Sequence, residues 1–398
     1  MKLTDVCDFQ GGSQPPKNQW SDEPKEGYIR MLQIRDFTQD NSKVEYVKIT
    51  NSTKKCEEKD ILIARYGASI GKILTGLSGA YNVAMMKVVI DENIVDRKFI
   101  YNFLKSDVFQ NYIKNVGQRA AQAGFNKGEL SKININLPTL KEQKNVAKEL
   151  DKVQEIIDIR EKQIEQLDEL IKSQFVEMYG TEKDTKYNTK TLIEITKKEA
   201  NSIKRGPFGG SLKKEDFVAD GYLVYEQRHA IHNDFEYEKY YITEEKYKDM
   251  QMFKVKPKDL LISCSGVTLG KIAEVPENAK KGIINQALLK ITLDSNIMNN
   301  IYFIQYFRSD EVQEKLFGFS RGSGIPNFPS MNEVKKIRFI CPPIELQNKF
   351  ANFVKQIDKQ KFEIQKSLKA TKKLQESLMN KYFDVLRPMS CSKSFGRT

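Results

Sequence analysis

The chain contains the same order of motifs twice, and this internal repeat constrains the fold more than any other feature of the sequence. Residues 60–73 read DILIARYGASIGKI, and residues 259–272 read DLLISCSGVTLGKI. Both copies run from an acidic residue through an apolar strand and a small polar turn to Gly-Lys-Ile. The offset between matched positions drifts from 189 at Leu3 to 204 at Lys132, so the second copy carries insertions. Such drift is expected of a duplicated domain whose surface loops have diverged.

Each copy ends in a helical stretch with a heptad seam, in which core positions alternate at spacings of four and three residues. The apolar seam residues are Val146, Leu150, Val153, Ile157, Ile164, Leu167 and Ile171 in the first stretch, and Phe350, Val354, Ile357, Ile364, Leu368 and Leu378 in the second. Polar residues interrupt both seams, so we expect each helix to need the other as its partner. Residues 141–180 carry seven basic and ten acidic residues, whereas 345–398 carry twelve basic and five acidic ones. This opposite charge favours pairing between the two helices over self-pairing.

The remaining segments contain short β-type runs that Gly, Asn and Lys turns interrupt, which is typical of mixed α/β domains. We therefore predict an α+β (mixed α/β) fold in which two tandem globular domains are separated by two long helices. The helices pair as an antiparallel coiled coil with pseudo-twofold symmetry, because a parallel pair would need a return path along its full length. The predicted segments are a first domain at 1–140, a spacer helix at 141–181, a second domain at 182–344, a second spacer helix at 345–388 and a C-terminal tail at 389–398.

Composition and charge favour a cytoplasmic protein that binds a polyanion. The net charge of +12 and the isoelectric point near 9.1 make nucleic acid the first partner to consider. The mean hydropathy is −0.55, and no apolar run approaches the length of a membrane span. Asp5 and Asp8 interrupt what would be the apolar part of a signal peptide. The five cysteines contain no CxxC pair and indicate a reducing compartment.

The sequence offers no catalytic, nucleotide or metal site. The turn from Gly67 to Lys72 has three residues between its glycines, where a nucleotide-binding loop has four, and Ile73 stands where Ser or Thr is required. We favour a turn whose backbone amides and lysine contact a DNA phosphate, while a plain hairpin turn remains the alternative. His229 and His232 are the only histidines and lack a third ligand nearby, so core or surface roles suffice.

Polar loops at equivalent places in the two copies combine Arg, Gln, Asn, Gly and aromatic residues. Arg is suited to reading guanine, and Gln or Asn to reading adenine. The alternative is that these loops are solvated connections that close a sheet, but their recurrence favours DNA binding. The DNA-binding residues that we predict are Gln33, Arg35, Tyr66, Ser69, Lys72, Asn82, Gln118, Arg119, Asn126 and Lys127 in the first copy, and Arg205, Gln227, Arg228, Ser265, Thr268, Lys271, Asn285, Gln286, Arg321, Ser323 and Asn327 in the second.

Over residues 1–388 the chain resembles the specificity (S) subunit of type I restriction-modification systems. Besides residues 60–73, the motifs that carry the resemblance are YIRMLQIRDF at 28–37, LPTLKEQKNVAKEL at 137–150, LDELIKSQFVEMYG at 167–180, CPPIELQNKFANFV at 341–354 and LQESLMNKYFD at 374–384. The resemblance implies that each globular domain is a target recognition domain that reads one half of a split site in double-stranded DNA. It also implies that the spacer helices set the gap between the halves and bind two methyltransferase (M) subunits, with motor-nuclease (R) subunits completing the complex.

The same resemblance implies that this chain catalyses nothing and binds no cofactor, because S-adenosylmethionine, and the ATP and Mg²⁺ used in restriction, belong to the partner subunits. The loops of the two copies differ strongly, which implies two different half-sites. Two other classes of protein remain open: a DNA-binding scaffold that recruits no methyltransferase, and a coiled-coil adaptor whose basic charge only aids solubility. A steep loss of DNA affinity with rising salt distinguishes DNA binding from the adaptor role.

Overall fold

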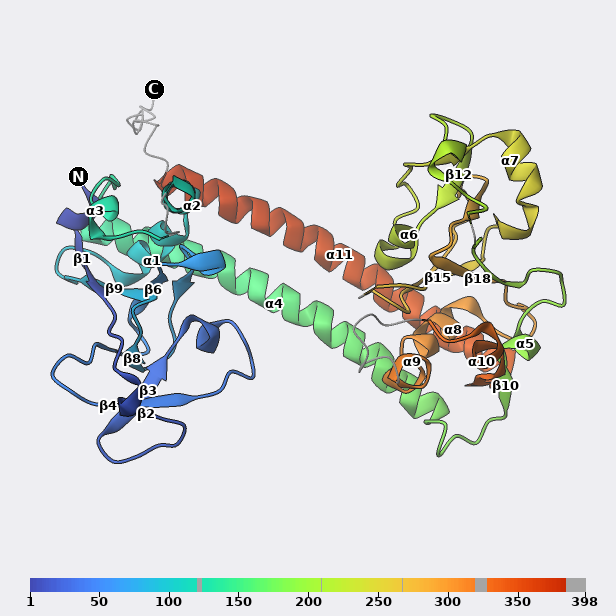
Figure 1. Ribbon diagram of the computed structural model, residues 1–398, viewed down its shortest axis with the longest axis horizontal. Coiled ribbons are helices and arrows are strands. Elements are labelled where there is room, and N and C mark those ends of the chain that lie inside the picture. The colour runs from blue at the N-terminus through green and yellow to red at the C-terminus, as the bar shows by residue number, and fades with distance from the viewer. Residues whose placement is uncertain (120–123, 209, 267, 319–327, 384–398) are drawn as a thin grey trace, which may run out of the picture. The chain divides into compact units, whose positions relative to one another are not determined.

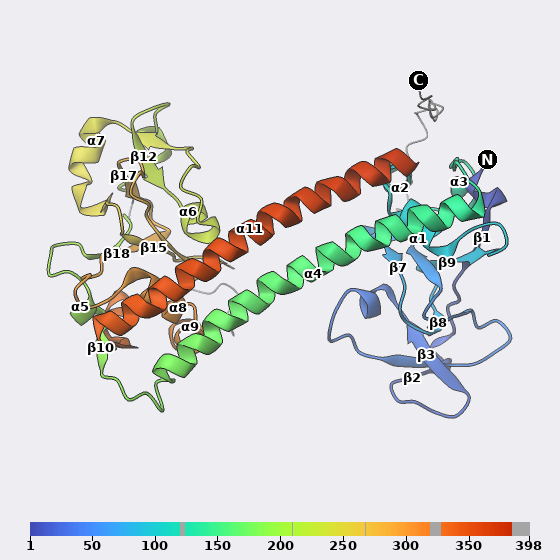
Figure 2. The ribbon, with the colours of Figure 1, turned by 180° about the vertical axis from the view of Figure 1, so that it is seen from behind.

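The computed structural model describes residues 1–119, 124–208, 210–266, 268–318 and 328–383. The chain divides into two compact units, which are Met1–Glu161 with Lys366–Thr398 (unit 1) and Lys162–Gln365 (unit 2). The long helices α4 (Leu140–Tyr179) and α11 (Ile344–Phe383) each contribute one part to unit 1 and the other part to unit 2 (Figures 1 and 2). The predicted tail at 389–398 and the last five residues of the predicted second spacer helix lie outside the described residues.

Unit 1 contains two sheets, three short helices and one part of each long helix (Figure 1). The first sheet is antiparallel, with the order β1 (Cys7–Gly11), β9 (Met85–Ile90), β6 (Ile61–Ala64) and β7 (Ile73–Leu74). The second has the order β2 (Trp20–Ser21), β4 (Glu45–Lys48), β3 (Tyr28–Leu32), β8 (Gly79–Tyr81) and β5 (Lys55–Cys56), and its β3 and β8 run parallel. The helices are α1 (Arg97–Lys105), α2 (Asp107–Arg119) and α3 (Lys127–Leu130), and 3-10 turns cover Leu3–Asp5, Lys17–Gln19, Ile34–Phe37 and Gly67–Ser69.

Unit 2 has two four-stranded sheets and a two-stranded ribbon. The first sheet has the order β11 (Ile203–Arg205), β18 (Leu288–Ile291), β15 (Leu260–Ser263) and β16 (Ile272–Glu274), and the second has the order β13 (Tyr241–Ile242), β12 (Tyr222–Tyr225), β17 (Gly282–Ile284) and β14 (Lys254–Val255). The ribbon pairs β10 (Thr189–Thr191) with β19 (Arg338–Ile340). The helices are α5 (Leu192–Ile195), α6 (Gln227–His232), α7 (Glu244–Asp249), α8 (Asn300–Phe307), α9 (Asp310–Phe317) and α10 (Met331–Lys336), with 3-10 turns at Lys214–Asp216 and Gln251–Phe253.

The repeat in the sequence is a repeat of the fold. The sheet β11-β18-β15-β16 has the same strand order and the same antiparallel directions as β1-β9-β6-β7. The sheet β13-β12-β17-β14 repeats β4-β3-β8-β5, including its one parallel pair. A single antiparallel bridge between Lys2 and Asn134 stands in unit 1 where unit 2 has the β10–β19 ribbon. The predicted fold class, a mixed α/β fold with tandem domains and two long helices, is confirmed.

Within each unit, α4 and α11 pair antiparallel, and their ends are part of the core. In unit 1, Gln375 of α11 donates to Gln154 of α4 over 2.8 Å, and the Phe383 ring packs 5.2 Å from Phe99 of α1. In unit 2, the Tyr179 hydroxyl of α4 donates to the Leu346 carbonyl of α11 over 2.9 Å. The buried ends of the two helices therefore extend the apolar core of each unit.

The polar seam positions also find partners across the helix pair. Arg160 donates to the hydroxyl of Thr371 and, over 3.2 Å, to the carbonyl of Ser367 in unit 1. Lys361 forms an ion pair with Asp168 in unit 2. These contacts join an acidic helix to a basic one, and burying a polar group at a seam fixes the register of a helix pair.

One buried glutamine at the start of each long helix ties the helix to its sheet domain. Gln143 and Gln347 are the fourth residues of α4 and α11, and both are completely buried. The Gln143 Oε1 accepts from the backbone amide of Asp96, the N-cap of α1, over 2.9 Å, and its Nε2 donates to the Ile94 and Pro138 carbonyls over 3.2 and 2.9 Å.

Gln347 makes the same three bonds in unit 2. Its Oε1 accepts from the amide of Asn299, the N-cap of α8, over 2.9 Å, and its Nε2 donates to the Ile297 and Pro342 carbonyls over 3.0 and 2.8 Å. In each unit, three backbone groups from two chain segments therefore have their hydrogen-bond partner in a single side-chain amide, which no apolar side chain can replace.

The Gly-Lys turn of the first copy, from Gly67 to Lys72, is a closed hairpin. The amides of Ile70, Gly71 and Lys72 donate to carbonyls of the same hairpin over 2.9–3.1 Å, so these amides are not free to bind a phosphate. The predicted phosphate contact of the other amides of the turn and of the exposed lysine side chain stays a prediction. In unit 2, Gly266 and Gly270 both have positive φ, but only Gly270 is crowded, because an added Cβ would lie 2.3 Å from the Phe317 ring.

Replacing the buried glutamine of unit 2 is expected to destabilise that unit. The Gln347→Leu variant removes the side-chain partner of the Asn299 amide and the Pro342 carbonyl and leaves the Ile297 carbonyl with only the Cys341 thiol, so the free energy of unfolding should fall by about 3 kcal/mol. Gln356→Leu, at an exposed position of the same helix, should change it by less than about 0.5 kcal/mol. Urea unfolding followed by circular dichroism measures both. Equal midpoints for the two variants would contradict the role of the amide.

The two glycines of the hairpin are expected to differ in their tolerance of alanine. Gly266→Ala carries only the positive-φ strain of about 1–2 kcal/mol, because the space around it is open. Gly270→Ala adds an overpacking cost of about 1–3 kcal/mol against Phe317. In the same unfolding measurement, Gly270→Ala should therefore have a clearly lower free energy of unfolding than Gly266→Ala. The reverse order would show that the turn does not pack on α9 as described.

Candidate nucleic-acid interface

In each unit, the ends of the strands of the first sheet and the parallel strand pair of the second sheet meet at one edge. In unit 1 the amide of Asn82 donates to the Leu32 carbonyl over 3.3 Å, and a Cβ on Gly12 would lie 2.0 Å from the Asn82 carbonyl oxygen. In unit 2 a Cβ on Gly206 would lie 1.8 Å from the Asn285 carbonyl oxygen. Only glycine fits either crossing, so both units build this edge in the same way.

In unit 1 the edge presents Arg65, which follows β6. Its Nε donates to the Phe125 carbonyl over 3.2 Å, and its Nη1 donates to the Val83 carbonyl over 3.4 Å. Its guanidinium carbon lies 5.0 Å from the centroid of the Tyr66 ring, which is cation–π distance. Tyr66 is 40% exposed and forms an isolated antiparallel bridge with Gly124. A cation and an aromatic ring therefore lie together on the surface.

In unit 2 the edge presents Arg205 of β11. Its guanidinium carbon lies 5.2 Å from the Phe328 ring and 5.5 Å from the ring of Phe208, which is 65% exposed. Its Nη2 donates to the Cys264 carbonyl over 3.5 Å. Burial raises the pKa of the Cys264 thiol to about 12, although Arg205 opposes the shift, so the thiol is neutral and supplies no counter-charge. At the next residue after Cys264, the Ser265 hydroxyl accepts a hydrogen bond from Gln227 over 2.9 Å.

The structure brings together some of the predicted DNA-binding residues. Tyr66 and Asn82 lie at the edge of unit 1, and Arg205, Gln227, Ser265 and Asn285 lie at the edge of unit 2. Ser69 and Lys72, and in unit 2 Thr268 and Lys271, lie on the adjoining hairpin turns, and Gln286 is exposed directly after Asn285.

Other predicted residues have partners within the chain. Gln33 donates to Glu45 over 2.7 Å, and Arg35 forms an ion pair with the same carboxylate. Asn126 caps α3, and Lys127 forms an ion pair with Asp8. Their roles in DNA binding stay predictions.

Arg228 points to its own loop, 3.6 Å from Asp234 and 4.3 Å from the Tyr237 ring. The backbone of Gln118 and Arg119 belongs to the last turn of α2, and their side chains are outside the described part of the chain. The predicted Arg321, Ser323 and Asn327 lie outside the described residues altogether.

Arg65 and Phe208 are members of the edge that the sequence did not single out. Arg65 continues the apolar run ILIAR, which reads as a strand, and Phe208 follows Gly-Pro, which reads as a turn. The one signal for Arg65 is a lone cation placed directly between an apolar strand and a glycine turn.

The two histidines do not converge on a common point. His229 is fully buried, with its Nε2 2.9 Å from the Tyr237 carbonyl oxygen, whereas His232 is exposed. Within the described residues, no group of three or more His, Cys, Asp and Glu side chains has the geometry to hold a metal ion. The helices that the structure describes include none that is long and apolar enough to cross a membrane.

Burial along the helix seams varies with position. The seam residues Val146, Leu150, Val153, Ile157, Ile171, Phe350, Val354 and Ile357 are buried, and Ile164, Leu167, Ile364, Leu368 and Leu378 are half-buried.

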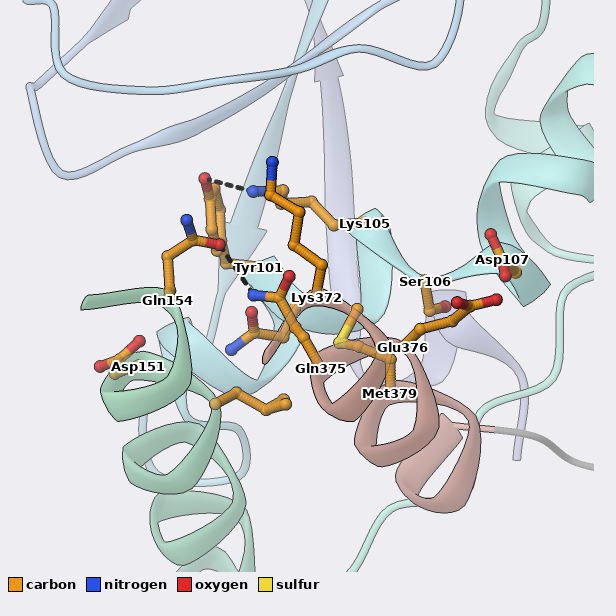
Figure 3. A pocket seen from close by; sticks show the side chains of 12 residues that line it. Tyr101, Lys105, Ser106, Asp107, Asp151, Gln154, Lys372, Gln375, Glu376 and Met379 are labelled. Atoms are coloured by element: carbon orange, nitrogen blue, oxygen red, sulfur yellow. Dashed lines mark hydrogen bonds between the residues drawn. The ribbon is translucent and has the colours of Figure 1, made fainter. Parts of the chain in front are cut away.

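A polar cavity of about 270 Å³ lies in unit 1 between α1, α4 and α11 (Figure 3). The Gln375–Gln154 hydrogen bond crosses it, and Lys105 donates to the Tyr101 hydroxyl over 3.4 Å. Unit 2 has a cavity of about 520 Å³ at the corresponding place, lined by α4, α8 and α9. Charged side chains of both signs line each cavity.

A family model for the type I restriction modification DNA specificity domain matches the chain twice, at residues 1–169 and 185–373. The chain is 23% identical over 376 residues to the type I restriction enzyme MjaVIII specificity subunit of Methanocaldococcus jannaschii, covering 87% of this chain and 85% of that one. It is 22% identical over 381 residues to the StySPI specificity subunit of Salmonella potsdam, covering 89% and 81%.

Solved structures share the fold. A type I restriction-modification S subunit from M. genitalium matches with a TM-score of 0.55 and 17% identity, covering 98% of this chain and 96% of that chain. A chain from a study of complex assembly and conformational transition of the type I restriction-modification system matches with a TM-score of 0.59 and 14% identity, covering 96% of each. Since the family model covers both repeats and most of the sequence, the chain belongs to the type I restriction-modification DNA specificity family.

Proposed function

We propose that each unit of this non-catalytic specificity subunit reads one half of a bipartite site in double-stranded DNA. The observation that carries the proposal is that two copies of one edge display different side chains. Arg65 and Tyr66 lie at this edge in unit 1, and Arg205, Phe208 and Gln227 lie at it in unit 2. Two edges with the same backbone structure but different side chains are consistent with a DNA site made of two different half-sites. Residues 1–140 and 182–344 are then the two target recognition domains.

Within each half-site, phosphate contacts position the domain and base contacts specify the sequence. The net charge of +12 and the exposed lysines beside the edge, Lys72 and Lys271, favour the phosphate contacts. The planar and amide side chains at the edge are suited to base edges in the major groove. The other predicted DNA-binding residues are proposed to contact either phosphates or bases in the same way. This includes the residues that have a hydrogen-bond or ion-pair partner within the chain.

The long helices are the proposed docking site for two methyltransferase (M) subunits, with motor-nuclease (R) subunits joining for restriction. Both helices expose large apolar side chains, which on a surface mark binding sites for other proteins. These are Ile156, Ile159 and Leu374 in unit 1, and Leu170, Val176 and Phe362 in unit 2. We assign S-adenosylmethionine, ATP and Mg²⁺ to those partners. We also propose that the complex is cytoplasmic, because its substrate is DNA.

The length of the helices is proposed to set the unread gap between the half-sites. In support, α4 and α11 each run without a break from residues of one unit to residues of the other. The pairs Arg160–Thr371 and Asp168–Lys361 hold the two helices in a fixed register near the boundary. A gap fixed in this way changes only in steps that keep the heptad seam in phase.

Exchange of one recognition domain should change one half of the site. If residues 1–140 are replaced by the equivalent domain of a relative with a known site, adenine methylation should move to a motif with one new half and one unchanged half. Sequencing that detects methylated adenine in cells carrying the complex provides the measurement. The reciprocal exchange of 182–344 is the control and should alter the other half. A change in both halves after a single exchange would refute independent reading.

Removal of one heptad from both helices should shorten the gap. Deleting 161–167 and 362–368 keeps the seam in phase and removes about 10 Å of helix, or about 3 base pairs of DNA. Insertion of one heptad into each helix is the matched control and should lengthen the gap by the same amount. The methylation motifs of the two variants report the gap directly. A gap that stays constant in both would contradict the spacer role.

A further inference from the structure

One strand position distinguishes the edges of the two units. The strand register places Gly11 opposite Met86 in unit 1 and Arg205 opposite Leu289 in unit 2. Met86 and Leu289 occupy the same place in the central strand pair of their sheets. Gly11 and Arg205 are therefore equivalent positions, and only the second carries a side chain.

The guanidinium that unit 1 lacks at this position comes from another strand. Arg65 follows β6, and a Cβ on Gly11 would lie 3.6 Å from the Arg65 Nη1. In unit 2 the residue equivalent to Arg65 is Cys264, and Arg205 reaches its carbonyl with Nη2. Both units thus place one guanidinium at the same point of the sheet, and the two arginines come from strands on opposite sides of the central strand.

Both guanidinium groups keep hydrogen-bond donors to spare. A guanidinium carries five N–H donors. Arg65 uses its Nε and Nη1 on backbone carbonyls, and the Nε of Arg205 is buried without a hydrogen-bond partner among the described residues. Neither arginine forms an ion pair with a carboxylate in the part of the chain that the structure describes. A partly buried cation without a counter-charge is stabilised when a ligand supplies hydrogen-bond acceptors.

An exposed aromatic ring stands beside each guanidinium. Tyr66 is 40% exposed beside Arg65, and Phe208 is 65% exposed beside Arg205. The two rings also come from non-equivalent positions, because Tyr66 follows β6 and Phe208 follows β11. An aromatic ring next to an arginine orients the planar fork and leaves its outer N–H groups free.

We infer that Arg65 in unit 1 and Arg205 in unit 2 each read a guanine in the half-site of their unit, an inference that rests on the proposed function. Guanine presents N7 and O6 as two acceptors in the major groove, which match the two parallel donors of a guanidinium. A phosphate is the competing ligand for such a fork, and it would give affinity without discrimination between bases.

The test uses the full chain assembled with its methyltransferase subunits, at one salt concentration, on a duplex that carries its methylation motif. Each guanine is replaced in turn by 7-deazaguanine, which has a C–H in place of N7. In the wild-type complex, one such replacement in each half-site should weaken binding about tenfold. In the Arg65→Gln variant, 7-deazaguanine in the unit 1 half-site should cause no further loss of DNA affinity. In the other half-site it should still weaken binding about tenfold. Arg205→Gln should show the converse.

Three further variants separate reading from folding and from charge. Arg338→Gln removes the same charge from an exposed position on β19, away from the edge, and should keep both tenfold costs. Arg65→Lys and Arg205→Lys keep the charge but lose the planar fork, and should bind DNA with a smaller 7-deazaguanine cost than the wild type.

Equal 7-deazaguanine costs in wild type and in both Gln variants would overturn the inference, as would half-sites that contain no guanine. A uniform loss of affinity in the Gln variants would assign the two arginines to phosphates and would also overturn it. None of these results affects the proposed function, which fails separately if the wild-type complex has no bipartite site.

Discussion

The way each long helix leaves its domain depends on one buried amide. Gln143 and Gln347 each satisfy the N-cap amide of a neighbouring helix and two loop carbonyls, in a place that water does not reach. Because these backbone groups belong to two separate segments, the turn that leads into α1 or α8 and the proline loop before the long helix, the side chain fixes both segments to the helix. The antiparallel pairing of α4 with α11 inside each unit starts from this fixed point.

Local patterns in the sequence predicted most of the fold. The runs at 61–64 and 260–263 are strands because buried strands are continuous apolar runs, and the heptad spacing produced two long helices. The repeat was visible because both copies keep their acidic residue, glycine turn and glutamine at the same relative places. These features depend on neighbours within a few residues, which is the range that a single sequence reports.

The candidate interface was predictable only in part, because it depends on contacts between strands far apart in the chain. Gln33 and Arg35 look available for DNA in the sequence, yet both bind Glu45 on the neighbouring strand. Arg65 looks like the end of a strand, and its equivalence in space to Arg205 emerges only from the strand register. The backbone crossing at the edge accepts only glycine at Gly12 and Gly206. The side chains that line the edge, in contrast, differ between the two units. A fixed edge with exchangeable side chains allows one fold to carry two different specificities.

The adenine methylome of the source cell, compared with and without this gene, shows whether one chain reads both halves of a single DNA site. Deletion of the gene should abolish one bipartite motif completely, in both halves and on both strands, and the gene alone should restore it. An unchanged methylome, or a motif that survives with one of its halves intact, would contradict the claim.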